Sequence, residues 1–415
     1  MHCRSCGQSK TLIEILNLNQ TPWCNNFLTK EEIGNEPKYP LVLMFCKNCE
    51  LVQLSYTVKK EVMFSHHTYV SGTTKTLSEH FYNIAKENKE QFNLQENDLI
   101  VDIGGNDGTN LLQYQKLGFK ELRNVESAEN ISLISSKNGI ATDNCYFNEK
   151  YVDWYLSVKS NKAKLINASG VFFHLEELHS VISGIKKLLM NGGVFIVQFM
   201  YLGDMIKNLA FDGIYHEHLC YYSLKSLKIL LEPHELSIFD AYHSDIHGGS
   251  IIAKIEHSDS NIRFKLTERY EKLINEENIT LETLQLFAKE VENRKHNLKN
   301  FLMDLKNSDM NIIACGAPAK STTFLNYFNI KNDVIEYILE VNDLKIGLYT
   351  PGTYIPIIRE EKKLLFNKNI LLLSWNFLRE ILNKNKDVIL NSNSRFIIPF
   401  PEIHIINKNN INEYL

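Results

Sequence analysis

The stretch Leu99-Ile-Val-Asp-Ile-Gly-Gly-Asn-Asp-Gly108 decides the fold, because it combines a strand signal and a turn signal. Its first five residues form a short, mostly apolar run, which predicts a buried strand. Three glycines follow within five positions, and a helical pattern begins at Thr109. A strand, a glycine turn and a helix make the first βα unit of a nucleotide-binding domain. The sequence therefore predicts an α/β protein.

The glycine turn differs from the loop that binds a dinucleotide. That loop reads G-x-G-x-x-G, whereas this one has Gly104, Asn106 and Gly108 after an acidic strand residue. A second predicted strand, Leu122–Glu126, ends in a carboxylate suited to two ribose hydroxyls. The pattern favours the adenosyl end of S-adenosylmethionine over a pyrophosphate. We expect the cofactor to be held by Asp102, Gly104, Asn106, Gly108, Glu126, Asn167 and Gln198.

Later elements extend the sheet and give the site a location. Strand-like runs at Ala163–Ala168 and Gly193–Phe199 flank a helix-like Glu176–Leu189, and this alternation predicts parallel strands. The runs Leu236–His243 and Ser250–Glu256 then predict an antiparallel hairpin. A seven-stranded sheet whose last strand is antiparallel is characteristic of class I methyltransferases, an analogy of fold alone. Ligands of open sheets lie beyond the carboxyl ends of the strands, and the site is expected there.

The segment Asp212–Ser223 is the chain's densest group of titratable and aromatic side chains. Glu217 stands between His216 and His218, and Tyr215 and Tyr222 are close by. Such groups can hold or transfer protons near neutral pH. They also form purely structural networks, and these residues alone leave both interpretations open.

Two pairs of cysteines predict a structural metal site. Cys3 and Cys6 form one C-x-x-C motif and Cys46 and Cys49 form another, and four thiolates make a closed tetrahedral set for zinc. A redox role would need a βαβ setting that neither pair has. Since cysteine fills every ligand position, no position stays open for catalysis.

The C-terminal third begins with helices and continues as a second α/β unit. Residues 261–306 are charged, lack glycine and proline, and carry apolar residues at helical spacing. A strand, turn and helix start follow at Asn311–Ser321, where Lys320 and helix N–H groups suit an anion. An ordinary βα turn explains the same residues equally well. We predict a zinc-binding domain over 1–70, a cofactor domain over 71–260, and a helical linker with a second Rossmann-like domain over 261–415.

The totals exclude several classes of protein. The chain has 415 residues, 44% of them hydrophobic and 23% charged, as in a globular protein of two or three domains. A formal net charge of −4 leaves no surplus of cations for binding nucleic acid. The sequence shows neither a signal peptide nor a membrane span, so we expect a cytoplasmic protein with reduced cysteines. A small molecule is the expected partner, and the sequence leaves the oligomeric state open.

Several motifs together resemble one known family over essentially the whole chain. They are the two cysteine pairs, D-I-G-x-N-D-G at Asp102–Gly108, Y-H-E-H at Tyr215–His218, G-G-S at Gly248–Ser250, G-A-P-A-K at Gly316–Lys320 and T-P-G-T at Thr350–Thr353. The sequence is similar to the sugar C-methyltransferases of deoxysugar biosynthesis, which methylate C-3 of nucleotide-linked 4-keto sugars. The resemblance implies an N-terminal zinc domain, a middle domain holding S-adenosylmethionine, and a C-terminal domain of related fold that helps to anchor the nucleotide sugar.

The resemblance also implies roles for single residues. It makes His218 the base, with Tyr215 and Glu217 beside it, and makes His174 and Tyr69 further residues that face the substrate. We expect the substrate, with dTDP the expected nucleotide, to contact His216, Tyr222, Lys320 and Ser321. Gln198 and Ser321 depart from the family pattern, which usually has glutamate and glycine there. The reaction type therefore transfers more safely than the identity of the sugar.

The chemistry expected of such an enzyme is simple. A proton next to a ketone is acidic because its removal gives an enolate, so the enzyme must supply a base and align two partners. We predict that His218 removes the C-3 proton, that Glu217 or a tyrosine orients it, and that His174 or Tyr215 donates to the enolate oxygen.

Three alternatives remain at this stage. The first is a sugar O- or N-methyltransferase, which would not remove a carbon-bound proton. The second is a nicotinamide-dependent oxidoreductase acting on nucleotide sugars, against which the glycine loop and the hairpin both argue. The third is a zinc-knuckle module that binds a protein or nucleic acid, in which the H-E-H cluster would have no use.

Overall fold

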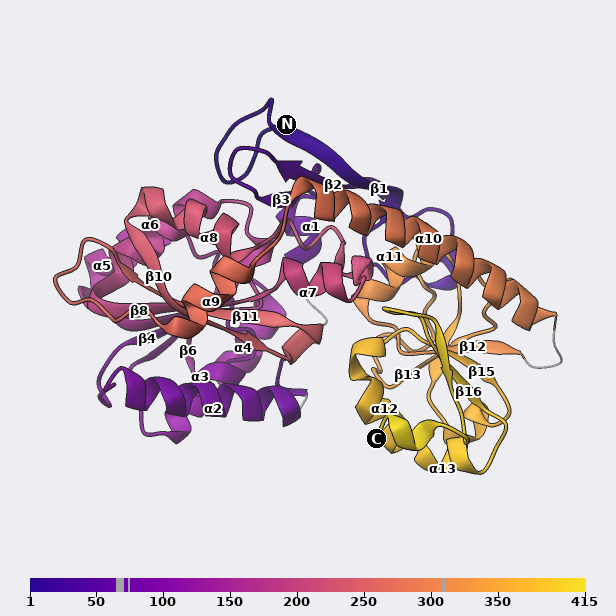
Figure 1. Ribbon diagram of the computed structural model, residues 1–415. Coiled ribbons are helices and arrows are strands. Elements are labelled where there is room, and N and C mark those ends of the chain that lie inside the picture. The colour runs from indigo at the N-terminus through magenta and orange to yellow at the C-terminus, as the bar shows by residue number, and fades with distance from the viewer. Residues whose placement is uncertain (65–70, 74, 308–310) are drawn as a thin grey trace.

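The computed structural model describes residues 1–64, 71–73, 75–307 and 311–415, and it arranges them around three sheets (Figure 1). The N-terminal strands lie at the top of the view, the large middle sheet at the left and the C-terminal sheet at the right. The helix α10 (Leu281–Lys306) runs from the N-terminal strands to the C-terminal sheet. The three sheets thus meet around a common centre.

The N-terminal sheet has four antiparallel strands in the order β1-β2-β3-β9. They are β1 (Leu12–Pro22), β2 (Lys38–Cys46), β3 (Val52–Leu54) and β9 (Cys220–Tyr221). The short helix α1 (Lys60–Phe64) follows β3. β9 comes from the middle domain, and it pairs with β3 through Val52↔Tyr221 and Gln53↔Cys220. The segment that carries His216, Glu217 and His218 is therefore joined to the N-terminal sheet by strand pairing.

The middle sheet has seven strands in the order β10-β11-β8-β7-β4-β5-β6. They are β4 (Ile100–Ile103), β5 (Leu122–Val125), β6 (Ala141–Asp143), β7 (Ala163–Ser169), β8 (Leu189–Met200), β10 (Leu236–Ser244) and β11 (Ser250–His257). β11 pairs antiparallel with both β8 and β10. The other pairings, β8 with β7, β7 with β4, β4 with β5 and β5 with β6, are parallel. This is the sheet with an antiparallel hairpin that the sequence predicts.

Helices cover this sheet and connect its strands. They are α2 (Lys75–Gln91), α3 (Thr109–Lys116), α4 (Glu129–Lys137), α5 (Glu149–Lys159), α6 (Leu178–Leu188), α7 (Leu202–Lys207) and α8 (Leu224–Leu231). The most amphipathic is α6, which buries Leu178, Val181, Ile182, Ile185 and Leu188 at helical spacing.

The linker begins as a helix later than predicted. After β11, Arg263 Nε and the backbone N–H of Phe264 donate to the Glu256 carboxylate, which keeps the chain extended. Two helices follow, α9 (Glu268–Glu276) and α10. The N-terminus of α10 is capped by Thr280, whose hydroxyl accepts from the N–H of Thr283.

The C-terminal sheet has the order β14-β13-β12-β15-β16-β17, with parallel pairings except for the last strand. Its strands are β12 (Ile312–Cys315), β13 (Ile338–Glu340), β14 (Ile357–Arg359), β15 (Asn369–Leu372), β16 (Arg395–Ile398) and β17 (His404–Ile406). Its helices are α11 (Ala319–Phe328), α12 (Leu378–Lys384) and α13 (Lys386–Leu390). This confirms a second Rossmann-like domain.

One hydrophobic cluster runs through all three domains. It includes Leu43 of the N-terminal sheet, Ile166 of the middle sheet and Ala314 of the C-terminal sheet. A shared core fixes the three domains relative to one another, because packed interiors deform little. Within the described ranges, every helix is too short or too polar to span a lipid bilayer.

Candidate active site

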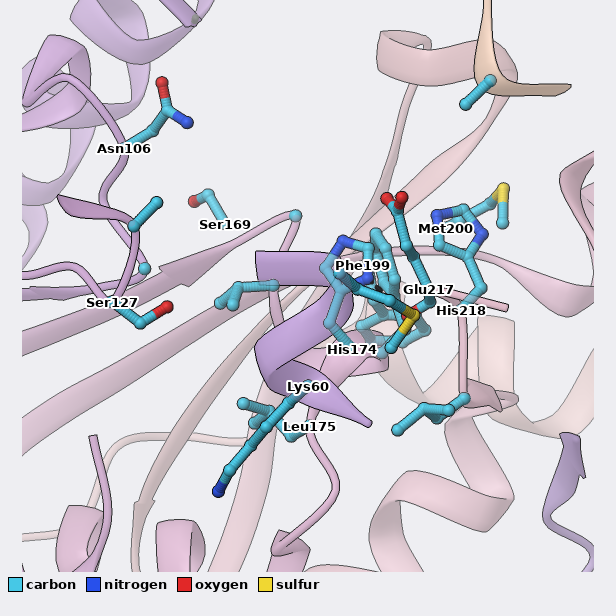
Figure 2. Close-up of a pocket in the computed structure, with 18 of the residues that line it drawn as sticks. Lys60, Asn106, Ser127, Ser169, His174, Leu175, Phe199, Met200, Glu217 and His218 are labelled. Carbon is cyan, nitrogen blue, oxygen red and sulfur yellow. Dashed lines mark hydrogen bonds between the residues drawn. The ribbon is translucent and has the colours of Figure 1, made fainter. Parts of the chain in front are cut away.

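A cavity of about 520 Å³ lies where the three domains meet. The N-terminal domain contributes Asn25, the middle domain contributes Gly104, Glu126, His174 and His218, and the C-terminal domain contributes Lys320. Figure 2 shows His174, Glu217 and His218 gathered together, with Asn106, Ser127 and Ser169 set apart from them. A volume of this size suits a small-molecule site.

The glycine turn after β4 lines the first end of the cavity. Gly104 has a φ of 61°, and a Cβ there would come within 2.6 Å of Val171. Asn106 also has a positive φ, 53°, and its backbone N–H donates to Glu126 Oε2 over 3.0 Å. The other oxygen, Oε1, accepts from the N–H of Ala128 over 2.8 Å. These contacts fix the Glu126 carboxylate at the end of β5.

This end of the cavity fits the adenosyl part of S-adenosylmethionine. A side chain at Gly104 would collide with Val171, which also lines the cavity, so the turn requires glycine there, and the fixed carboxylate suits a ribose diol. Gln198 also lines the cavity, with its Oε1 2.9 Å from Nε2 of His80. The residues Ser127, Ser169 and Gly170 line it too, and none belongs to a motif that would have identified it from the sequence.

Three of the residues expected to hold the cofactor lie behind the cavity lining. Asp102 is buried beneath Gly105 and accepts from Asn110 Nδ2 over 3.0 Å, and burial raises its pKa to about 7. Asn167 pairs with Asp102 across the sheet. Gly108 starts α3 with a φ of 82°. None of the three lines the cavity, and each supports the turn or the strand behind it. Their part in holding the cofactor stays a prediction.

Removing the carboxylate of Glu126 tests the cofactor end. We expect Glu126→Ala to weaken S-adenosylmethionine binding by about 10- to 100-fold, because a hydrogen bond to a charged group is worth about 1.5–3 kcal/mol. Isothermal titration calorimetry measures this affinity directly. Glu129→Ala, at an exposed position that does not line the cavity, is the matched control. Equal affinities of both variants and the unmodified protein would remove Glu126 from the cofactor site.

His218 lies at the other end of the cavity in a defined tautomer. The side chain is 5% exposed, and Nδ1 lies 2.8 Å from the carbonyl oxygen of Gly213. A carbonyl only accepts, so Nδ1 carries the hydrogen and Nε2 of the neutral ring is the proton acceptor. The rings of Tyr215 and Phe173 lie 3.8 and 4.5 Å away, measured between centroids. These contacts hold the imidazole in one orientation.

His174 is held in the same tautomer by a neighbouring carbonyl. It lies in the 3₁₀ turn Phe172–His174, and Nδ1 donates to the backbone oxygen of Glu217 over 2.6 Å. Its ring centroid is 5.1 Å from that of His218. In the neutral state His174 therefore offers an acceptor at Nε2, and it can donate from that atom only as a cation.

The carboxylate of Glu217 is held by the N-terminal domain. Its side chain is 3% exposed, and Oε1 accepts from Trp23 Nε1 over 2.7 Å and from Asn25 Nδ2 over 2.6 Å. The carbonyl of Gly213 fixes Nδ1 of His218, and the Tyr215 ring packs on the imidazole, so orientation of His218 by Glu217 or a tyrosine stays a prediction. Trp23 and Asn25 were not identified from the sequence, because nothing in their local pattern marks them.

The C-terminal domain lines the cavity with two lysines and with Pro318 and Ala319. Lys320, in the first turn of α11, lines the cavity with its Nζ 5.5 Å from the centroid of the Trp375 ring. Lys345 also lines it and donates to the carbonyl of Ala317 over 2.8 Å, and burial lowers its pKa. Ser321 does not reach the cavity, because its hydroxyl turns back to the carbonyl of Pro318.

Two residues of the H-E-H segment face away from the cavity. His216 is 1% exposed, its Nε2 lies 3.4 Å from the carbonyl of Tyr39 in β2, and burial lowers its pKa to about 4. Tyr222 is fully buried between the rings of Phe172 and Phe199. Both side chains pack in the interior and neither lines the cavity, so their contact with substrate stays a prediction that this geometry does not favour. Tyr69 lies outside the described residues.

The four cysteines of the N-terminal pairs converge in space. Their sulfur atoms all lie within 4.8 Å of one another, with 3.4 Å between Cys3 and Cys49 and 3.6 Å between Cys6 and Cys46. Zinc–sulfur bonds of about 2.3 Å in a tetrahedron place sulfur atoms about 3.8 Å apart. The set therefore fits one zinc ion, and three of the four side chains are buried.

Comparison with known proteins divides the chain into three matched regions. Residues 3–64 match a family of zinc-binding domains, and residues 78–239 match a family described as methyltransferase domain. Residues 245–401 match the C-methyltransferase C-terminal domain. The chain is an S-adenosylmethionine-dependent C-methyltransferase. These matches exclude the three alternatives that the sequence left open, namely an O- or N-methyltransferase, an oxidoreductase and a binding module.

A curated relative supports the same assignment over the full length. The chain is 29% identical to the C-methyltransferase NovU of Streptomyces niveus over 408 residues, which are 97% of this chain and 96% of the relative.

Among solved structures, magnesium protoporphyrin IX methyltransferase from Synechocystis with bound S-adenosylmethionine matches at 13% identity and a TM-score of 0.33. That match covers 43% of this chain and 78% of the other.

Proposed function

We propose that this C-methyltransferase acts at C-3 of a nucleotide-linked 4-keto deoxysugar, with His218 as the base. The observation that carries the proposal is His218 itself, whose Nδ1 is bound to a carbonyl so that Nε2 of the neutral ring accepts a proton. The same cavity is lined by Gly104 of the glycine turn and by Lys320 and Lys345 of the C-terminal domain. A basic wall suits the diphosphate of a nucleotide sugar.

The proposed reaction requires proton removal before the new bond forms. His218 Nε2 takes the C-3 proton, and the electron pair of that C–H bond moves into an enolate. S-adenosylmethionine, when bound beside Gly104 and Glu126, supplies the electrophilic methyl group. C-3 then supplies the electron pair of the new carbon–carbon bond while the methyl–sulfur bond breaks. The electron pair of that bond stays on sulfur, S-adenosylhomocysteine leaves, and the carbonyl of the sugar is restored.

Tyr215 is the better donor to the enolate oxygen. The pKa of Tyr215 lies well above its ordinary value, mainly because the hydroxyl is buried and secondly because the negative charge of Glu217 is near. The hydroxyl therefore stays protonated. Neutral His174 already uses its N–H on the carbonyl of Glu217. Of the two donors that the sequence suggests, we therefore assign the enolate hydrogen bond to Tyr215. A donor placed where charge develops is a major source of rate acceleration.

Methyl transfer from isotopically labelled S-adenosylmethionine tests this function. We expect a panel of nucleotide-linked 4-keto deoxysugars to include at least one acceptor, with the label on the carbon next to the ketone. Mass spectrometry detects the transfer, and NMR locates the labelled carbon. The matched negative substrates are the corresponding 4-hydroxy sugars, which cannot form the enolate. Label on oxygen, or transfer to the 4-hydroxy sugars, would contradict the proposal.

A further inference from the structure

The N-terminal domain reaches into the active site through the loop Trp23-Cys24-Asn25, which follows β1. Trp23 Nε1 and Asn25 Nδ2 donate to Oε1 of Glu217 over 2.7 and 2.6 Å. The sulfur of Cys24 lies 3.7 Å from the same oxygen. Three consecutive residues therefore converge on one carboxylate oxygen that lies 192 to 194 positions later in the chain.

Glu217 connects this loop to both histidines of the cavity. Its backbone carbonyl accepts the Nδ1 hydrogen of His174 over 2.6 Å, and its peptide leads directly into His218. A rotation of the Glu217 backbone would move the partner of His174 and the ring of His218 together. Fixing the carboxylate opposes that rotation.

The loop is itself anchored independently of Glu217. The hydroxyl of Thr322 in α11 donates to the carbonyl of Cys24 over 3.0 Å. Four residues after Cys24, Leu28 exchanges two backbone hydrogen bonds with Tyr349, of 2.9 and 2.8 Å. Since the C-terminal domain fastens the loop, its two donors are in place before any substrate arrives. Preorganised support of this kind sharpens catalytic geometry.

We infer that Trp23 and Asn25 are positioning residues for methyl transfer, holding Glu217 and through it His174 and His218. This role rests on the proposed function, which assigns the proton transfer to His218. The zinc-binding domain then contributes to the reaction even though none of the four cysteines of the metal cluster lines the cavity.

Trp23→Phe tests the role by removing one N–H while keeping an aromatic ring. We expect kcat to fall by about 10- to 100-fold, because small displacements of catalytic groups have effects of that size. The KM for the sugar and the affinity for S-adenosylmethionine should stay unchanged. Thr21→Val is the matched control, because Thr21 is buried at the end of β1 and its hydroxyl donates to Leu18, away from Glu217. A control that loses kcat equally would overturn the inference.

Asn25→Asp and Asn25→Ala separate a hydrogen-bond donor from a space-filling residue. Aspartate has nearly the size of asparagine but places a second carboxylate beside Glu217, which raises the pKa of the pair. Below that pKa one proton is bound, and it restores a hydrogen bond between the two groups. Asn25→Asp should therefore be less active than Asn25→Ala at neutral pH, with its optimum at lower pH. Identical pH profiles for the two variants would contradict a donor role.

A measurement without substrate separates this inference from the proposed function. Nitrogen-15 NMR of histidine rings reports which nitrogen carries the hydrogen, and His174→Asn and His218→Asn identify the two signals. We expect the Nδ1–H form in the unmodified protein and in Thr21→Val, and a mixture of tautomers at His174 in Trp23→Phe. If no sugar accepts a methyl group, the proposed function fails, while the ring signals still decide the positioning role. Unchanged signals in Trp23→Phe would exclude it.

Discussion

His218→Asn is expected to lower kcat for methyl transfer by about 10²–10⁴-fold, the usual contribution of a positioned base. Asparagine retains a polar side chain but has no group that takes up a proton near neutral pH. The affinity for S-adenosylmethionine should be unchanged, because Asn106 and Ser127, which belong to the glycine turn and to the end of the next strand unit, lie apart from His218 (Figure 2). Steady-state kinetics and calorimetry measure the two quantities separately.

Exchange of the C-3 proton gives this prediction a readout that belongs to the base alone. In deuterated water, with S-adenosylhomocysteine in place of the methyl donor, the unmodified enzyme should exchange the substrate's C-3 proton, and His218→Asn should not. His216→Asn is the matched control two positions away, since its ring faces β2 rather than the cavity. It should retain exchange. An active His218→Asn, or a loss of exchange in both variants, would contradict the assignment.

The contrast between His216 and His218 shows where sequence reasoning ends. Both flank Glu217, and titratable groups in one short segment predict a site without saying which side chain enters it. The structure distinguishes them through tertiary contacts, because His216 packs against Tyr39 and His218 against Phe173. No local pattern encodes which face of a loop a distant strand will cover.

The middle domain could be predicted because its signals are local. The apolar run ending at Ile103, the positive φ of Gly104 and the carboxylate of Glu126 belong to neighbouring βα units, and each has a specific residue preference. The hairpin was predicted at Leu236–His243 and Ser250–Glu256 from two strand patterns joined by a short turn, and each observed strand, β10 and β11, ends one residue later. Its insertion beside β8 completes the expected sheet.

The union of the domains at the active site could not be predicted in the same way. The pairing of β9 with β3 joins Tyr221 to Val52, and the bond from Asn25 to Glu217 spans 192 residues. Cys24 is buried between two neighbours in the chain that hold a carboxylate of the site. Such contacts depend on how complete domains pack, so they leave no periodicity or motif in the sequence.

Removing the zinc is expected to abolish methyl transfer while leaving S-adenosylmethionine bound. Cys46 ends β2 opposite Leu12, the first residue of β1, so the ion fastens the strand that leads to Trp23. Structural zinc sites contribute about 10–16 kcal/mol in small zinc peptides, enough to decide whether a small domain folds. Cys46→Ser should therefore lose zinc and lower the temperature at which the protein unfolds.

The consequence for catalysis follows from the loop rather than from the ion. When β1 is released, Trp23 and Asn25 no longer fix Glu217, whereas the seven-stranded sheet keeps its own core around Ile100 and Leu165. Metal analysis, thermal unfolding, kinetics and calorimetry on Cys46→Ser and on chelator-treated enzyme check each step. Cys220→Ser is the control, because Cys220 is buried in the same small sheet but lies outside the cysteine cluster. If zinc-free enzyme kept its kcat, the loop would not need the metal. If it lost kcat and cofactor binding together, the zinc would be stabilising the whole chain and not the arrangement of Glu217.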